Sequence, residues 1–121
     1  MKELIRTQAF NEFYEASPER VQEKIDYIAM MMEELPVVNA KFVKKLENTE
    51  YYEMRVSVNN EYRVILFTMD NPNFMQATKI LLLNGFLKKS TKDYKAQISI
   101  ANKIKDAYYE NEDEHGEDIK A

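Results

Sequence analysis

Arg55 and Arg63 are the two residues of this 121-residue chain whose type and spacing point most directly to chemistry. They lie in residues 51–58 and 61–69, whose alternating patterns predict neighbouring antiparallel strands. A two-residue turn at Asn59-Asn60 would put the arginines on opposite sheet faces among apolar side chains. A three-residue loop would put Arg55 directly across from Arg63. Burying an unpaired charge is costly, and a one-residue slip moves every side chain to the other face. We therefore expect the three-residue loop, although Asn-Asn suits a two-residue type I′ turn.

In that register the strand pair has one polar face and one apolar face. The polar face carries Glu53, Arg55, Ser57, Glu61 and Arg63, and the apolar face carries Tyr52, Met54, Val56, Tyr62, Val64 and Leu66. Two arginines directly opposite each other repel. Two explanations stay open: Glu53 or Glu61 offsets the repulsion, or the pair binds an anion, for which phosphate fits two guanidinium groups best.

Lysines extend this basic character along the chain. Residues 39–46 predict a short helix with Lys41, Lys44 and Lys45 on one face, which is either an ordinary solvated surface or a second basic patch. Residues 79–109 carry seven lysines against two acids. The chain has a net charge of −4, but the acids gather in residues 1–35 and 110–121. The pattern predicts a locally basic site on a nearly neutral body.

The elements that would position these residues form an α+β domain. We expect a strand over residues 4–8 and two helices that form a hairpin, the second with Ser17 as N-cap and Pro18 as first helical residue, ending before Pro36. The apolar run in residues 78–86 predicts a strand covered on both faces. A last helix is expected over residues 93–109, with Ser90 and Asp93 as its capping residues.

Composition excludes several classes of protein. Without cysteine there is no disulfide scaffold, zinc ribbon or thiol nucleophile. No apolar run approaches the roughly 20 residues that span a bilayer, and the N-terminus does not resemble a signal peptide. We expect a soluble cytoplasmic protein without a membrane partner. It should have one domain, residues 1–109, followed by an acidic and disordered tail, residues 110–121. The single histidine, His115, lies in that tail and is not expected to be catalytic.

Three motifs follow one another in this chain: Tyr52-Glu53-Met54-Arg55-Val56, then Glu61-Tyr62-Arg63-Val64-Ile65-Leu66-Phe67, then Leu82-Leu83-Asn84-Gly85-Phe86-Leu87-Lys88-Lys89-Ser90. In this order and spacing they resemble the RelE/ParE superfamily of toxins, and most of all its phage-derived, HigB-like branch. Residues 40–47 also match that branch, and the resemblance covers roughly residues 4–109. It implies the RelE-like fold: a small, mostly antiparallel sheet of about four strands, an N-terminal helical hairpin and a C-terminal helix.

The resemblance implies a toxin of a type II toxin–antitoxin system. Most RelE- and HigB-like members cleave mRNA on the ribosome by attack of the ribose 2′-hydroxyl on the adjacent phosphate, with no metal or other cofactor. The implied partners are the ribosome, mRNA and a cognate antitoxin, which we expect to be a helix-turn-helix protein. Two alternatives stay open: a ParE-like inhibitor of gyrase, and a degenerate toxin that only binds its antitoxin.

The resemblance also implies roles for individual residues. Arg55 and Arg63 would hold the scissile phosphate and its developing charge, and Lys88 or Lys89 would protonate the leaving 5′-oxygen. Glu53 is the candidate general base, since an ordinary lysine has a pKa of about 10.4, far from neutral pH. The expected RNA-binding residues are Lys41, Lys44, Lys45, Phe86, Lys92 and Tyr94.

Overall fold

A computed structural model describes residues 1–120, with side chains described for residues 1–111. The elements are β1 (Glu3–Arg6), α1 (Gln8–Ala16), α2 (Glu19–Glu34), β2 (Val43–Lys45), β3 (Tyr51–Val58), β4 (Asn60–Thr68), β5 (Lys79–Leu87) and α3 (Asp93–Lys120). This is the expected α+β fold. In the described part of the chain, no helix is both long and apolar enough to cross a membrane.

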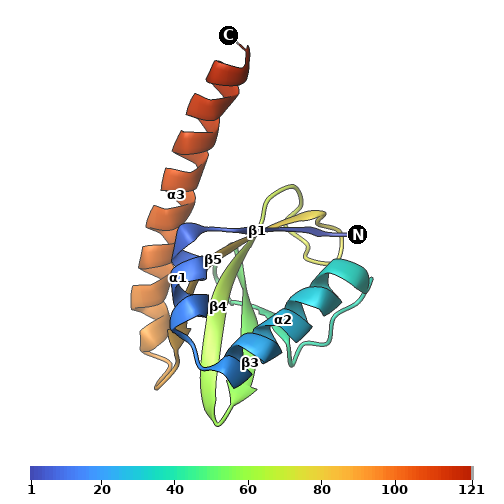
Figure 1. Ribbon diagram of the computed structural model, residues 1–121, viewed down its shortest axis with the longest axis vertical. Coiled ribbons are helices and arrows are strands. Elements are labelled where there is room, and N and C mark those ends of the chain that lie inside the picture. Colours follow the sequence, from blue (N-terminus) through green and yellow to red (C-terminus); the bar gives the residue numbers. More distant parts are fainter. Residues whose placement is uncertain (121) are drawn as a thin grey trace.

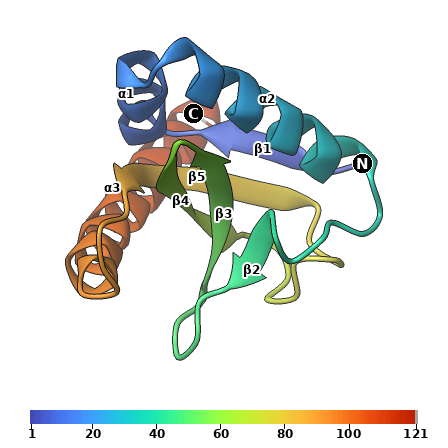
Figure 2. The same cartoon turned by 90° about the horizontal axis from the view of Figure 1, so that it is seen from below.

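The five strands form one mixed sheet in the order β1-β5-β4-β3-β2. β1 runs parallel to β5, and the other neighbouring pairs are antiparallel. Helices α1 and α2 cover one face of the sheet, and α3 covers the other (Figures 1 and 2). β5, buried along most of its length, lies between α1 and α3, as its apolar sequence predicted.

The sheet has one strand more than the predicted four. This strand, β2, replaces the short helix that we expected over residues 39–46. A turn at Asn39–Phe42 leads into Val43, and residues 43–45 pair antiparallel with β3 at the sheet edge. Side chains alternate between faces in a strand, so Lys44 and Lys45 point to opposite sides of the sheet. The prediction that Lys41, Lys44 and Lys45 share one helical face was therefore wrong. The backbone bonds gained with β3 outweigh the weak helical preference of so short a segment.

The junction between α1 and α2 also differs from the prediction. Ser17 is the C-cap of α1, and its Oγ donates a hydrogen bond to the Phe13 carbonyl at 2.7 Å. Pro18 takes the N-cap position of α2 without a side-chain bond, so the expected Ser17 cap was wrong. The first strand ends at Arg6 because Thr7 caps α1: its Oγ1 accepts from the Phe10 amide at 3.2 Å and donates to the Leu82 carbonyl at 2.7 Å.

The register of the β3–β4 hairpin is the predicted one. Arg55 lies opposite Arg63, Ser57 lies opposite Glu61, and Asn59 turns the chain with a φ of 60°. This left-handed conformation is one that asparagine adopts more readily than most residues. The polar and apolar faces are therefore separated as the sequence indicated.

An extra residue in β5 shifts its register against β4. Leu66 pairs with Leu82, whereas Val64 pairs with Gly85, so one residue of β4 lies opposite two residues of β5 between these pairings. Beyond this bulge Phe86 lies opposite Arg63, on the face covered by α3. Without the extra residue, the alternation of side chains would turn Phe86 toward α1 and α2.

Helix α3 continues beyond the predicted end at residue 109. Its side chains are described only as far as residue 111. The predicted acidic tail therefore falls almost wholly outside the described side chains, as does His115, and its disorder stays a prediction.

Gly85 allows α1 to approach β5 closely. A Cβ atom at this position would overlap the ring of Phe13, which packs directly on the strand. We expect Gly85→Ala to lower the free energy of unfolding by about 1–3 kcal/mol, the usual cost of overpacking a core. Urea unfolding followed by circular dichroism measures this. The double variant Gly85→Ala/Phe13→Leu should recover part of the loss, and equal stability of wild type and Gly85→Ala would contradict the packing argument.

Candidate functional site

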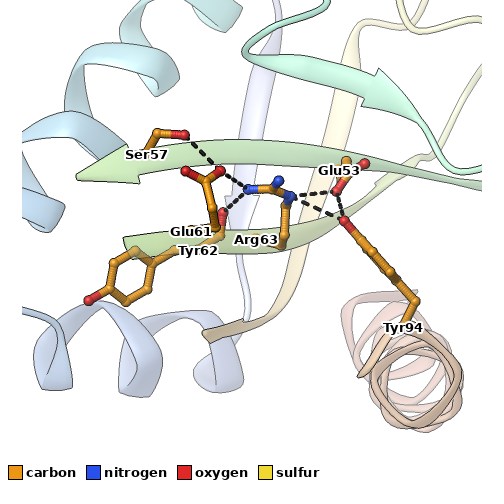
Figure 3. A network of polar contacts seen from close by, with 6 residues as sticks. All are labelled: Glu53, Ser57, Glu61, Tyr62, Arg63 and Tyr94. Atoms are coloured by element: carbon orange, nitrogen blue, oxygen red, sulfur yellow. Dashed lines mark hydrogen bonds and ion pairs between the residues drawn. The ribbon is translucent and has the colours of Figure 1, made fainter. Parts of the chain in front are cut away.

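The candidate site lies on the sheet face covered by α3, near the β3–β4 turn. Strand alternation brings Glu53, Arg55, Ser57, Glu61 and Arg63 to this face. Lys44 pairs with Glu53 and therefore shares the face. Lys88 also lies here, since its backbone amide bonds the Glu61 carbonyl at 2.8 Å. The start of α3 closes the site with Tyr94 (Figure 3).

Arg63 is the centre of a buried polar network, with only 2% of the residue exposed. Its Nε lies 3.0 Å from Glu53 Oε1 and donates to the Tyr94 hydroxyl at 3.1 Å. Its Nη1 donates to Glu61 Oε1 at 3.1 Å and to the Tyr62 carbonyl at 2.9 Å. Both glutamates of the first explanation pair with Arg63, which offsets its repulsion with Arg55, and anion binding by the pair stays a prediction.

Tyr94 joins this network to the helix. Its hydroxyl donates to Glu53 Oε1 at 2.5 Å, as Figure 3 shows. Its ring stands edge-on to Phe86, with centroids 5.7 Å apart and an interplanar angle of 89°. Lys88 Nζ lies 5.5 Å from the centroid of the Tyr94 ring, within cation–π distance. One tyrosine therefore contacts the buried carboxylate, the apolar core and an external cation.

Several ionisation equilibria respond to these contacts. Burial raises the pKa of Tyr94, as does its hydrogen bond to Glu53, so the phenol stays protonated. Hydrogen bonds from Ser57 and Arg63 lower the pKa of Glu61, which stays a carboxylate. Burial alone would lower the pKa of Arg63, but its bonds to Tyr94 and Glu61 and the charge of Glu53 raise it instead.

Arg55 differs sharply from the arginine across the strand. Its side chain is partly exposed, and within the described residues its guanidinium makes no hydrogen bond or ion pair. The two arginines that the sequence paired thus have different surroundings. Arg63 contacts two carboxylates, a phenol and a carbonyl through Nε and Nη1, whereas the Arg55 guanidinium has no hydrogen-bond or ion-pair partner among the described residues.

The other predicted site residues fall into three groups. Phe86, Lys88 and Tyr94 lie together beside Arg63. Lys89 and Lys92 are exposed on the turn before α3. The Nζ atoms of Lys41 and Lys45 lie over the rings of Phe42 and Tyr52 respectively. Both rings pack against the core beneath α2, so the structure does not bring these two lysines to the site.

Ser57 is a member of the network that the sequence reasoning missed. Its Oγ donates to Glu61 Oε1 at 2.8 Å, the same oxygen that accepts from Arg63. The signal was present in the predicted register, which places Ser57 directly opposite Glu61. Among the described residues, no group of three or more histidine, aspartate or glutamate side chains is arranged to hold a metal ion.

The sequence profile of the family described as phage-derived protein Gp49-like (DUF891) matches residues 12–106. The chain belongs to this family. The Gp49-like protein is also similar to solved structures. One is a double arginine-to-alanine mutant of E. coli toxin RelE in the free state, with a TM-score of 0.59 and 15% identity, covering 84% of this chain and 95% of that one.

A second solved structure is the RelB–RelE antitoxin–toxin complex from Methanococcus jannaschii, with a TM-score of 0.52 and 19% identity. It covers 74% of this chain and 96% of that one. At these identities the likeness establishes a shared RelE-like fold. A search of curated protein sequences finds no significant match.

The turn that carries the exposed lysines of this Gp49-like protein is held by Asp93 at the start of α3. Its Oδ2 accepts from the backbone amides of Lys89 at 2.7 Å and Ser90 at 3.0 Å, while Ser90 Oγ accepts from the Lys92 amide at 3.3 Å. This is the capping arrangement that the sequence predicted. The two amide bonds lower the pKa of Asp93 below its ordinary value.

We expect Asp93→Ala to lower the melting temperature at neutral pH, because both amides lose their acceptor. A carboxylate with a lowered folded-state pKa stabilises the fold above its unfolded pKa, and this contribution is lost as pH falls through the folded value. The difference between wild type and variant should therefore shrink as pH falls below about 3.9, the ordinary aspartate pKa. Thermal melts at neutral and acid pH test this; a difference independent of pH would contradict it.

Proposed function

We propose that this Gp49-like protein is the toxin of a toxin–antitoxin pair and cleaves mRNA bound to the ribosome. One observation carries the proposal. Polar and cationic side chains converge on one sheet face beside the start of α3, in a chain with the RelE-like fold. A cationic rim surrounds the buried network of Arg63. It consists of Arg55, of Lys88 beside the Tyr94 ring, and of the exposed turn lysines Lys89 and Lys92.

Such a rim suits RNA better than a small metabolite. Phosphate contacts supply affinity, and aromatic and guanidinium planes offer stacking surfaces for unpaired bases. The cations are few, so binding to free RNA should be weak and the ribosome should supply much of the substrate orientation. Uneven charge along the chain, with acids in residues 1–35, also confines RNA to one side.

The ribose 2′-oxygen forms a bond to the adjacent phosphorus and passes its proton to a solvent water molecule, while the bond from phosphorus to the 5′-oxygen breaks. Arg55 would stabilise the charge that develops on the phosphate. Lys88 would donate a proton to the leaving 5′-oxygen. Glu53 is 5% exposed, with one oxygen accepting from both Arg63 and Tyr94, which disfavours it as the base.

An antitoxin is the expected protein partner. The similar structure from Methanococcus jannaschii is an antitoxin–toxin complex, and that likeness supports a partner of the same kind for this chain. An antitoxin that covers the cationic rim would block RNA directly.

Expression of the protein without an antitoxin tests the function. Growth and translation should stop, and mapping of RNA 5′ ends should show cuts within translated codons. Arg55→Ala and Lys88→Ala should each relieve toxicity. Lys103→Gln removes a positive charge from an exposed position of α3 and should stay toxic. Intact mRNA with a DNA-damage response would indicate a gyrase inhibitor instead. Absence of toxicity together with tight antitoxin binding would indicate a binding protein only.

A further inference from the structure

We propose that Arg63 is a positioning residue that holds Glu53 and Tyr94, and that Arg55 is the arginine that binds the phosphate of RNA. The inference deepens the proposed function and rests on it. It divides between two roles a pair of arginines that the sequence alone treats as equivalent.

The surroundings of Arg63 leave it little capacity for a phosphate. Two of its three guanidinium nitrogens already donate to carboxylate, phenol and carbonyl oxygens at 2.9–3.1 Å. An incoming phosphate would need to displace a buried carboxylate that has lost its water.

Arg55 has the opposite character. It is partly exposed, and its guanidinium makes no hydrogen bond or ion pair among the described residues, although its charge helps to lower the pKa of Glu61. It lies between the edge strand that carries Lys44 and the strand that carries Arg63. Since a guanidinium fork binds phosphate best with its donors unoccupied, Arg55 is the better ligand of the two.

Arg63 still matters, because it acts through Tyr94. The phenol bridges Arg63 Nε and Glu53 Oε1, while its ring is held against Phe86 and beneath Lys88. Loss of Arg63 alone leaves Glu53 as a buried carboxylate without its ion pair, which disorders the site. Loss of both charges should be milder, because the amide oxygen that Glu53→Gln introduces can still accept the hydrogen bond from the Tyr94 hydroxyl.

RNA binding by the full chain provides the first test, with an uncleavable 2′-O-methyl RNA as the probe over a series of salt concentrations. We expect Arg55→Gln to weaken binding about tenfold and to reduce the salt slope by about 0.7, the value for one phosphate contact on a single strand. Glu53→Gln/Arg63→Met should keep the wild-type slope. Arg20→Gln, an exposed arginine of α2, is the matched control for loss of one charge. A reduced slope in the double variant, or an unchanged slope in Arg55→Gln, overturns the assignment.

Cleavage on programmed ribosomes provides the second test. Arg63→Met should lose activity. The double variant Glu53→Gln/Arg63→Met should cleave at least about tenfold faster than Arg63→Met, which corresponds to about 1.4 kcal/mol of coupling. A double variant as inactive as Arg63→Met would mean that Arg63 itself touches the phosphate. If the single variant fails to fold, the cleavage rate of the double variant relative to wild type still shows whether the Arg63 side chain itself is needed for cleavage. A wild-type protein that cleaves no mRNA would defeat the proposed function, whereas the binding series would still separate Arg55 from Arg63.

Discussion

The buried ion pair between Arg63 and Glu53 organises this side of the molecule. A guanidinium that is 2% exposed would be prohibitively costly without partners, and two carboxylates, a phenol and a carbonyl provide them. Because Glu53 and Glu61 come from different strands and Tyr94 comes from α3, the same contacts tie the hairpin to the helix. One network therefore neutralises the buried charge of Arg63 and also holds α3 against the β3–β4 hairpin.

A single inserted residue in β5 decides what that network can contact. The bulge between the Leu82 and Gly85 pairings turns Phe86 toward α3, where it meets Tyr94 edge-on. On the other face it sets Gly85 beneath Phe13, where a larger residue would not fit. The Gly-Phe pair thus serves both layers at once, with the glycine admitting α1 and the phenylalanine supporting α3.

The charges of the site are arranged as a neutralised centre with a cationic rim. The centre contributes rigidity, since its groups have few free donors. The rim of Arg55, Lys88 and the turn lysines keeps its donors exposed. A net charge of −4 for the chain conceals this arrangement, because most of the excess acid lies in residues 1–35 and 110–121. Long-range attraction to RNA should be modest, and local contacts should dominate recognition.

The sequence by itself determined the fold class, the hairpin register and the cap of α3. Each rests on local physics: side-chain alternation, the cost of burying an unpaired charge, and a carboxylate three residues after a serine. It did not determine the fate of residues 39–46, because pairing with β3 is a long-range gain that overrides weak helical spacing. Nor did it distinguish Arg55 from Arg63, which lie opposite each other in the same register. That difference was decided only in three dimensions, where α3 brings Tyr94 to one arginine and the bulge in β5 brings Phe86 beside it, while the other stays partly exposed to water.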